Sequence, residues 1–238
     1  MRAAIDLHIH SALSPCSDNS MTPNNIVNMA HLKGLDIIAV TDHNSAENAQ
    51  AILNCAKNVG IVAVAGMEVE TMEEIHIVCL FPGVEEALHV QEIVYDSLPP
   101  LKNRVIIFGE QLIMDENDEI TGNVDRLLLT ATNLGVEDIF QIMKKVDGVA
   151  IPAHVDRESY GIIARLGGIP DYLDIKYIEI SSTCDQSQFE KQAGITGKYS
   201  VVRSSDAHSL GSILERESFL EMDEISVRGL LDALRGKY

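Results

Sequence analysis

Short apolar runs alternate with amphipathic segments along most of the chain. Helical periodicity is found at Asn24–Lys33, Ala46–Asn58, Val136–Val146, Gln186–Gln192 and, at the end of the chain, Glu224–Arg235. The apolar runs have the length and β-branched content of buried strands, and they are Arg2–His8, Asp36–Val40, Ile61–Ala65, Ile75–Phe81, Gly148–Ile151, Ile175–Ile180 and Tyr199–Arg203. Nearly continuous apolar strands, each followed by a helix, indicate buried parallel pairing. The pattern predicts an α/β protein with either a barrel or a doubly wound sheet.

The segment from about residue 82 to residue 133 interrupts this alternation. It contains Pro99-Pro100 and a strand-like run at Val105–Phe108, and Gln111–Met114 and Ile120–Thr121 flank the acidic turn Asp115–Asp118. This arrangement predicts an inserted segment with a β-hairpin. Since no Gly/Ser linker or low-complexity run separates it from the rest, we expect one domain over residues 1–238.

Histidines and carboxylates gather where the apolar runs end. The i, i+2 spacing of His8 and His10 points both imidazoles to one face of a strand, and Asp206 and His208 share that spacing after the last run. The other polar groups at run ends are His43, Glu68, His76 and His154. Six of the eight histidines therefore track strand ends, where α/β barrels collect catalytic groups, and only His31 and His89 lie inside helical patterns.

Imidazole and carboxylate groups without thiolate are ligands typical of Zn, Mn or Fe. The four cysteines lie far apart and form no CxxC pair, which indicates reduced thiols and no Cys-based zinc site. The predicted ligand set is too large for one ion, so we expect a multi-metal site. Strand alternation turns Asp42 away from His43, which predicts a supporting role for Asp42, whereas Glu179 could face either the interior or solvent.

In order and as a set, these motifs resemble those of the PHP family (polymerase and histidinol phosphatase). The matching elements are Asp6-x-His8-x-His10, Asp18 after a Ser-rich loop, Thr41-Asp42-His43, Gly66-x-Glu68, His76, His154 and Asp206-x-His208. The resemblance implies a distorted (β/α)7 TIM-like barrel that holds two to three divalent metal ions. It also implies three ligand sets with Glu68 bridging: His8, His10, Glu68 and Asp206 for one ion, Asp18, His43 and His208 for a second, and His76 and His154 for a third.

Such a ligand set predicts hydrolysis of a phosphate ester, because paired divalent cations lower the pKa of bound water and stabilise the leaving oxygen. We expect Glu68, Asp206 and His208 at the catalytic centre. The chain has neither a Walker loop nor a GxSxG elbow, which excludes the common NTPase and serine-hydrolase classes. Arg157, three residues after His154, is the guanidinium best placed by sequence to bind the substrate phosphate.

Three alternatives to a phosphatase acting on a small phosphomonoester or nucleotide remain open. One is an exonuclease-like phosphodiesterase acting on nucleotides, and another is a non-catalytic metal-binding regulatory module. The third is a C–N hydrolase of the amidohydrolase type, against which the additional Asp18, His76 and His154 argue.

The formal charge of −18 bears on the partners of the protein. Nucleic-acid-binding proteins usually carry a basic surface, so this charge favours a small phosphorylated substrate and argues against extended nucleic acid. No apolar stretch reaches the roughly 20 residues of a membrane helix, and no signal peptide is recognisable at the N-terminus, so we expect a cytoplasmic protein without a membrane partner. The sequence carries no indication of an oligomeric state.

Overall fold

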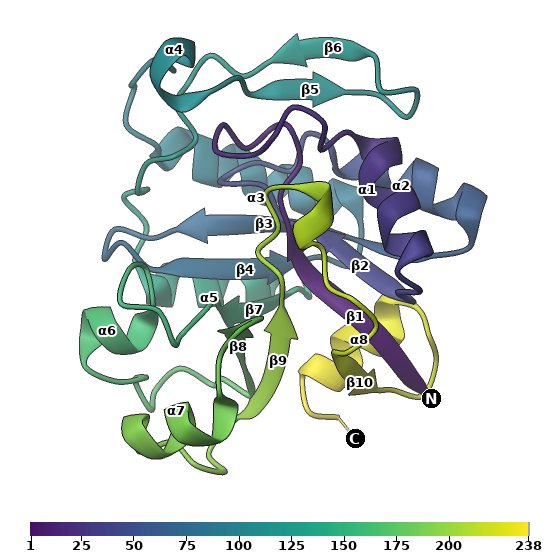
Figure 1. Cartoon of the computed structure of the whole chain (residues 1–238). Helices are drawn as coiled ribbons and strands as arrows, with labels where there is room; N and C mark the ends of the chain where they lie inside the picture. The colour runs from purple at the N-terminus through teal and green to yellow at the C-terminus, as the bar shows by residue number, and fades with distance from the viewer. Residues whose placement is uncertain (238) are drawn as a thin grey trace.

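The computed structural model describes residues 1–237. Its main sheet has six strands in the order β10-β1-β2-β3-β4-β7, and a second sheet pairs β8 with β9 in parallel (Figure 1). Contacts of β7 with β8 and of β1 with β9 place the two sheets edge to edge. The strands are β1 (Arg2–Ile9), β2 (Ile37–Val40), β3 (Val62–Glu70), β4 (His76–Leu80), β7 (Val149–Pro152), β8 (Tyr177–Ser181), β9 (Ser200–Ser204) and β10 (Phe219–Glu221).

Helices cover the outer face of these strands. Apolar side chains of α1 (Pro23–Leu32) and α2 (Ala49–Val59) pack against β1 and β2, and those of α3 (Val84–Ser97) and α5 (Val136–Lys145) pack against β3 and β4. A third core joins side chains from the other face of β1, β2, β4 and β7 to α8 (Val227–Leu234). The remaining helices are α6 (Ile162–Leu166), α7 (Gln186–Ala193) and the short 3-10 helix η1 (Leu210–Ser212). Buried polar side chains lie at the strand ends, outside these three apolar cores.

The seven predicted strands and five predicted helices are all present, with boundaries that shift by a few residues. The expectation of parallel pairing holds for β1-β2-β3 and for β8-β9, but β4 runs antiparallel to both β3 and β7. Only the short connection 71–75 joins β3 to β4, and such a connection permits a hairpin but no helical crossover. The fold is therefore an α/β fold with a curled, half-barrel sheet, and no continuous ladder closes seven strands into a (β/α)7 barrel within residues 1–237.

The segment 82–133 differs from the sequence prediction in two places. Its first part forms α3, so the departure from strand–helix alternation begins only after Ser97. The run Val105–Phe108 is a four-residue helix, α4, and not a strand: among residues 1–237 no strand pairs with it, and Gly109, at φ 99°, ends the turn. Two short strands, β5 (Leu112–Met114) and β6 (Ile120–Asn123), pair antiparallel around the acidic turn, above α3 in Figure 1.

None of the helices within residues 1–237 combines the length and apolar character needed to cross a bilayer.

Candidate metal centre

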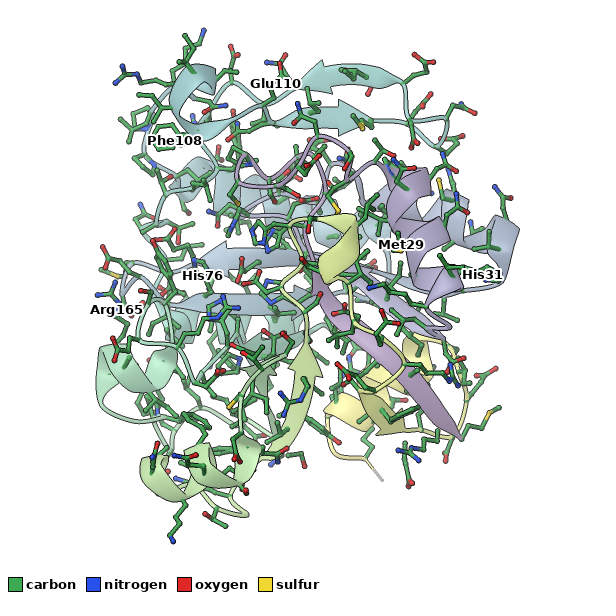
Figure 2. The ribbon with its side chains drawn as sticks, in the orientation of Figure 1. Met29, His31, His76, Phe108, Glu110 and Arg165 are labelled. Atoms are coloured by element: carbon green, nitrogen blue, oxygen red, sulfur yellow. The ribbon has the colours of Figure 1, made fainter. Side chains whose placement is uncertain are left out.

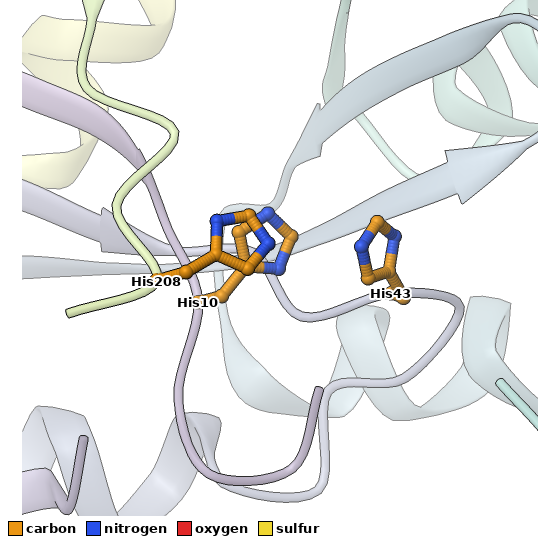
Figure 3. A group of neighbouring side chains, drawn as sticks. All are labelled: His10, His43 and His208. Carbon is orange, nitrogen blue, oxygen red and sulfur yellow. The ribbon is translucent and has the colours of Figure 1, made fainter. Parts of the chain in front are cut away.

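The predicted histidines and carboxylates meet at one edge of the curled sheet. His10 follows β1, His43 follows β2, and Glu68 lies near the end of β3. Because β4 is antiparallel to β3, its first residue, His76, reaches the same edge, and His154 arrives there after β7. The loop after β9 adds His208, whose ring centroid lies 4.3 Å from that of His10. Figure 3 shows the side chains of His208, His10 and His43. The ends of five strands, β1, β2, β4, β7 and β9, thus bring imidazoles to one cluster.

Glu68 is the centre of the cluster and is fully buried. Five imidazoles surround its two oxygens, with nitrogen–oxygen distances of 3.1 Å for His8, 3.4 Å for His10, 3.0 Å for His43, 2.9 Å for His76 and 3.3 Å for His154. Burial alone would raise the pKa of this carboxyl, but His76, His8 and His43 outweigh it and hold the pKa well below its usual value. The carboxylate is therefore ionised and available as a ligand.

The outer ring nitrogens of His8 and His10 show which nitrogen carries the proton. His8 Nδ1 lies 2.9 Å from Glu179 Oε1, a pure acceptor, so Nδ1 carries the proton. Ser14 Oγ donates to Asp42 Oδ1 at 2.7 Å and so accepts from His10 Nδ1 at 3.0 Å. When the imidazoles are neutral, this leaves both Nε2 atoms as lone-pair donors toward the centre.

The Nε2 atoms of His8 and His10 lie close to each other and to two carboxylates. They are 3.1 Å apart, and Asp206 Oδ1 lies 3.4 Å from His8 Nε2 and 3.0 Å from His10 Nε2. Glu68 Oε2 is buried without a well-aligned hydrogen bond from any of residues 1–237. Two imidazole nitrogens and two carboxylates thus converge on one another, and imidazole with carboxylate is a donor set that divalent metals such as Zn, Mn and Fe bind. The donor set therefore fits a metal.

Three groups of ligand atoms in the cluster are each compact enough to hold a metal ion. Their atoms lie within 4.8 Å of one another, and the groups are His8 with His10 and Glu68, His10 with His43 and His208, and His43 with Glu68 and His76. Glu68 belongs to two of these three groups.

The backbone at two cluster residues is strained. His154 has a φ of 28° and Asp206 a φ of 52°, values that residues other than glycine rarely adopt. Non-glycine residues in this region cost of order 1–3 kcal/mol each and persist where surrounding contacts hold them. The β1–β2 ladder also shifts register between Asp6 and Ile9, around His8. These local irregularities point the side chains of His8, His154 and Asp206 into the cluster.

One predicted ligand, Asp18, is not among the compact groups of ligand atoms found within residues 1–237. Asp18 is exposed, and its carboxylate accepts the backbone N–H of Ser20 at 2.7 Å. Its backbone N–H does donate to the carbonyl of His208 at 2.9 Å, which places the loop beside the cluster. The spacing of a Ser-rich loop predicts that it passes nearby but not which way its side chains turn.

The histidines at 31 and 89 are exposed on helices α1 and α3. In Figure 2, His31 lies on α1 near the edge of the molecule, well away from His76 beside β4. Both stand outside the cluster.

Two supporting carboxylates surround the histidines. Asp42 points away from the centre and accepts hydrogen bonds from the N–H and hydroxyl of Ser11, at 2.7 and 2.6 Å, as well as from Ser14. Glu179, which strand alternation alone left undecided, is buried and turns inward to His8. The sequence does carry a signal for Glu179, which lies inside an apolar run. A carboxylate buried in such a run is expected to have a partner, because unpaired buried carboxylates are rare.

Arg157 stands at the rim of the cluster with 41% of its side chain exposed. Its Nη1 donates to Asp206 Oδ2 at 2.5 Å, and its Nε donates to Ser181 Oγ at 3.0 Å. Within residues 1–237, neither of these contacts involves Nη2, so part of the guanidinium fork faces outward. The arginine that the sequence favoured therefore contacts Asp206 of the cluster.

The model of the PHP domain matches residues 6–160 of the chain, which include six of the eight clustered side chains, from His8 to His154, together with Arg157. The chain belongs to the PHP domain family. Asp206 and His208 lie beyond the matched region, and the fold brings them back to the same edge.

Solved structures share the fold of this PHP chain. Endonuclease Q from Pyrococcus furiosus matches with a TM-score of 0.67 and 20% identity, over 99% of this chain and 56% of that one. A protein from Bifidobacterium adolescentis, assigned as a metal-dependent phosphoesterase, matches with a TM-score of 0.64 and 16% identity over 96% of both chains. At 20% and 16% identity, these two structures show that this PHP chain shares their fold.

A curated relative is a 5'-3' exoribonuclease of Haemophilus influenzae, 35% identical over 83 residues. That match covers 34% of this chain and 29% of the exoribonuclease, so the PHP chain is matched to less than a third of that relative.

The expectation that extended nucleic acid is no partner is wrong as a deduction from charge. Endonuclease Q, whose fold matches 99% of this chain, has been solved with a 27-mer duplex substrate that carries an abasic lesion at the active site. Net charge is a property of the whole surface, whereas a substrate strand contacts only one rim of it and meets the positive charge of the ions there. An overall charge of −18 therefore does not exclude nucleic acid for this fold.

Proposed function

We propose that this PHP chain hydrolyses phosphate esters, with a phosphomonoester or a terminal nucleotide as substrate, at a centre of two to three Mn, Fe or Zn ions. The observation that carries the proposal is the convergence of His8 Nε2 and His10 Nε2 on the buried carboxylate of Glu68 and on Asp206. Divalent ions held there would lower the pKa of a water molecule and stabilise the leaving oxygen of the ester.

Different residues would hold the different ions. His8, His10 and Asp206 would hold one ion, His43 and His208 a second, and His76 and His154 a third, with Glu68 between them. Burial of Glu68 and most of the histidines excludes bulk water, so the ligands keep their directions. His208 and Asp206 are the partly exposed members, and they mark the side from which a substrate reaches the centre.

Arg157 is proposed to bind the substrate phosphate beside Asp206. Arg157→Ala should weaken substrate and inorganic phosphate binding by about 1.5 kcal/mol, roughly tenfold, since solvent screens this partly exposed group. Arg157→Lys should recover only part of the loss, because an ammonium lacks the planar fork. Phosphate inhibition constants of the wild type and both variants provide the measurement. Unchanged constants at unchanged metal content would remove Arg157 from the phosphate site.

Metal binding should be coupled to proton release. Burial lowers the pKa of His43, but Glu68 and the Cys16 thiol outweigh it and raise that pKa to about 10 in the metal-free protein. His43 is thus protonated at pH 7 and must become neutral to coordinate, so apparent affinity should rise about tenfold per pH unit for each proton released. Conversely, the ion pair of His43 and Glu68 stabilises the metal-free fold fully below pH 6.5, and this stability is lost as pH rises towards 10.

Calorimetric titration with Mn²⁺ in buffers of different ionisation enthalpy measures that release. We expect at least one proton per chain to be released at pH 7 and fewer as the pH approaches 10. Binding without proton uptake by the buffer at pH 7 would contradict the role given to His43.

A substrate screen tests the proposed reaction itself. The reconstituted protein should be assayed with p-nitrophenyl phosphate, bis-p-nitrophenyl phosphate, mononucleotides and short oligonucleotides. The fold of endonuclease Q supports a second candidate, a nuclease that cleaves phosphodiesters, and turnover of the diesters alone would favour it. Absence of turnover on every ester, with metal bound, would leave the chain as a metal-binding module.

A further inference from the structure

We infer that Glu179 is a positioning residue that holds two ligand histidines of different ions through a single carboxylate oxygen. This inference rests on the proposed metal centre. Glu179 Oε1 lies 2.9 Å from His8 Nδ1 and accepts the backbone N–H of His154 at 3.1 Å. His8 arrives on β1 and His154 after β7, so one atom on β8 joins two strand ends that do not pair with each other.

The first of these bonds determines the direction of the His8 lone pair. A neutral imidazole has one N–H and one lone pair, and Glu179 Oε1 can only accept, so Nδ1 carries the proton. The lone pair is then on Nε2, which faces Glu68 at 3.1 Å and Asp206 at 3.4 Å. Without this acceptor, the opposite tautomer would place an N–H where an ion has to bind.

The second bond restrains the strained backbone of His154. This residue has a φ of 28°, and its N–H is buried beneath the cluster. The main chain of β8 adds to the restraint, because the carbonyl of Glu179 accepts the N–H of Val155 at 2.9 Å. Loss of the side-chain acceptor would leave the His154 N–H unpaired, and the imidazole would follow the relaxing backbone away from Glu68, 3.3 Å from its Nε2.

Both effects require an acceptor oxygen and not a negative charge. A glutamine at position 179 offers the same oxygen to both donors, whereas a leucine of similar size offers none. Ser181 gives a matched control on the same strand and the same face. Its hydroxyl contacts Arg157 and Asp156 but no clustered histidine.

Calorimetric titration of the metal-free proteins with Mn²⁺ separates these variants. In Glu179→Leu we expect two binding steps to weaken by about ten- to a hundredfold each, which is the usual effect of removing the outer partner of a ligand histidine. Glu179→Gln should stay within about threefold of the wild type, and Ser181→Ala should bind all ions normally. A single weakened step in Glu179→Leu, or a glutamine variant as weak as the leucine variant, would overturn the inference.

Nuclear magnetic resonance of the Zn-loaded wild type adds a readout that does not depend on the leucine variant folding. The His8 Nδ1–H proton should appear as a downfield imidazole resonance protected from exchange, and it should persist in Glu179→Gln. Its absence from the wild type would contradict the role of Glu179. If the wild type binds no metal at all, the proposed centre fails, whereas normal metal binding by Glu179→Leu removes only this inference.

Discussion

Glu68→Gln is expected to lower kcat/KM by about a thousandfold or more, equivalent to roughly 4 kcal/mol of transition-state stabilisation. Within residues 1–237, Glu68 is the one carboxylate whose oxygens reach imidazoles from β1, β4 and the loops after β2 and β7. An amide keeps the volume and one acceptor oxygen, but it brings an NH₂ group and removes the charge from the middle of the cluster. Metal content should therefore fall together with activity.

Asp42→Asn gives the matched comparison for this variant. Asp42 is buried and charged in the same region, yet it faces Ser11 and Ser14 and reaches His10 only through the Ser14 hydroxyl. We expect a loss of about ten- to a hundredfold, since only the orientation of one ligand is disturbed. Equal loss of metal in both variants, at equal stability, would mean that Asp42 belongs among the ligands.

Removal of metal is expected to destabilise the fold strongly. A site saturated at a hundred times its dissociation constant adds about 2.7 kcal/mol, so two to three sites add roughly 5–8 kcal/mol and raise Tm by about 10–30 °C. The physical cause is the excess of buried ligand atoms around Glu68, which lose their shared counter-ion when metal is removed.

Thermal denaturation with and without a chelator measures this stabilisation. Wild type and Ser181→Ala should show the full shift, whereas Glu68→Gln should show little, because its ions are already lost. A wild-type Tm that does not change on complete removal of metal would contradict a centre built into the fold.

Much of the cluster could be predicted because strand ends are visible in the sequence. Apolar runs ended at His8, at His43 and before Asp206, and the curled sheet places these ends at one edge. The direction of β4 was not predictable from its composition, since an apolar run reads the same in a parallel and an antiparallel pair. His76 still reaches the cluster, because it is the first residue of β4 and the antiparallel direction of β4 brings that end to the same edge of the sheet.

Three other features could not be predicted from the sequence pattern. The inward turn of Glu179 is determined by its contacts with His8 and His154, at separations of 171 and 25 residues. The conformation of Val105–Phe108 depends on the absence of a partner strand, and short apolar runs do not distinguish a strand from a helical turn. The direction of the Asp18 side chain is a local loop property that neither spacing nor family motif determines.

Elemental analysis of the purified, reconstituted chain tests the central claim most directly. The geometry around Glu68 predicts two to three Mn, Fe or Zn ions per chain, and a marked loss of them in Glu68→Gln. One ion per chain would instead support a mononuclear centre of the amidohydrolase kind. Fewer than one ion per chain after careful reconstitution would contradict the proposed multi-metal centre.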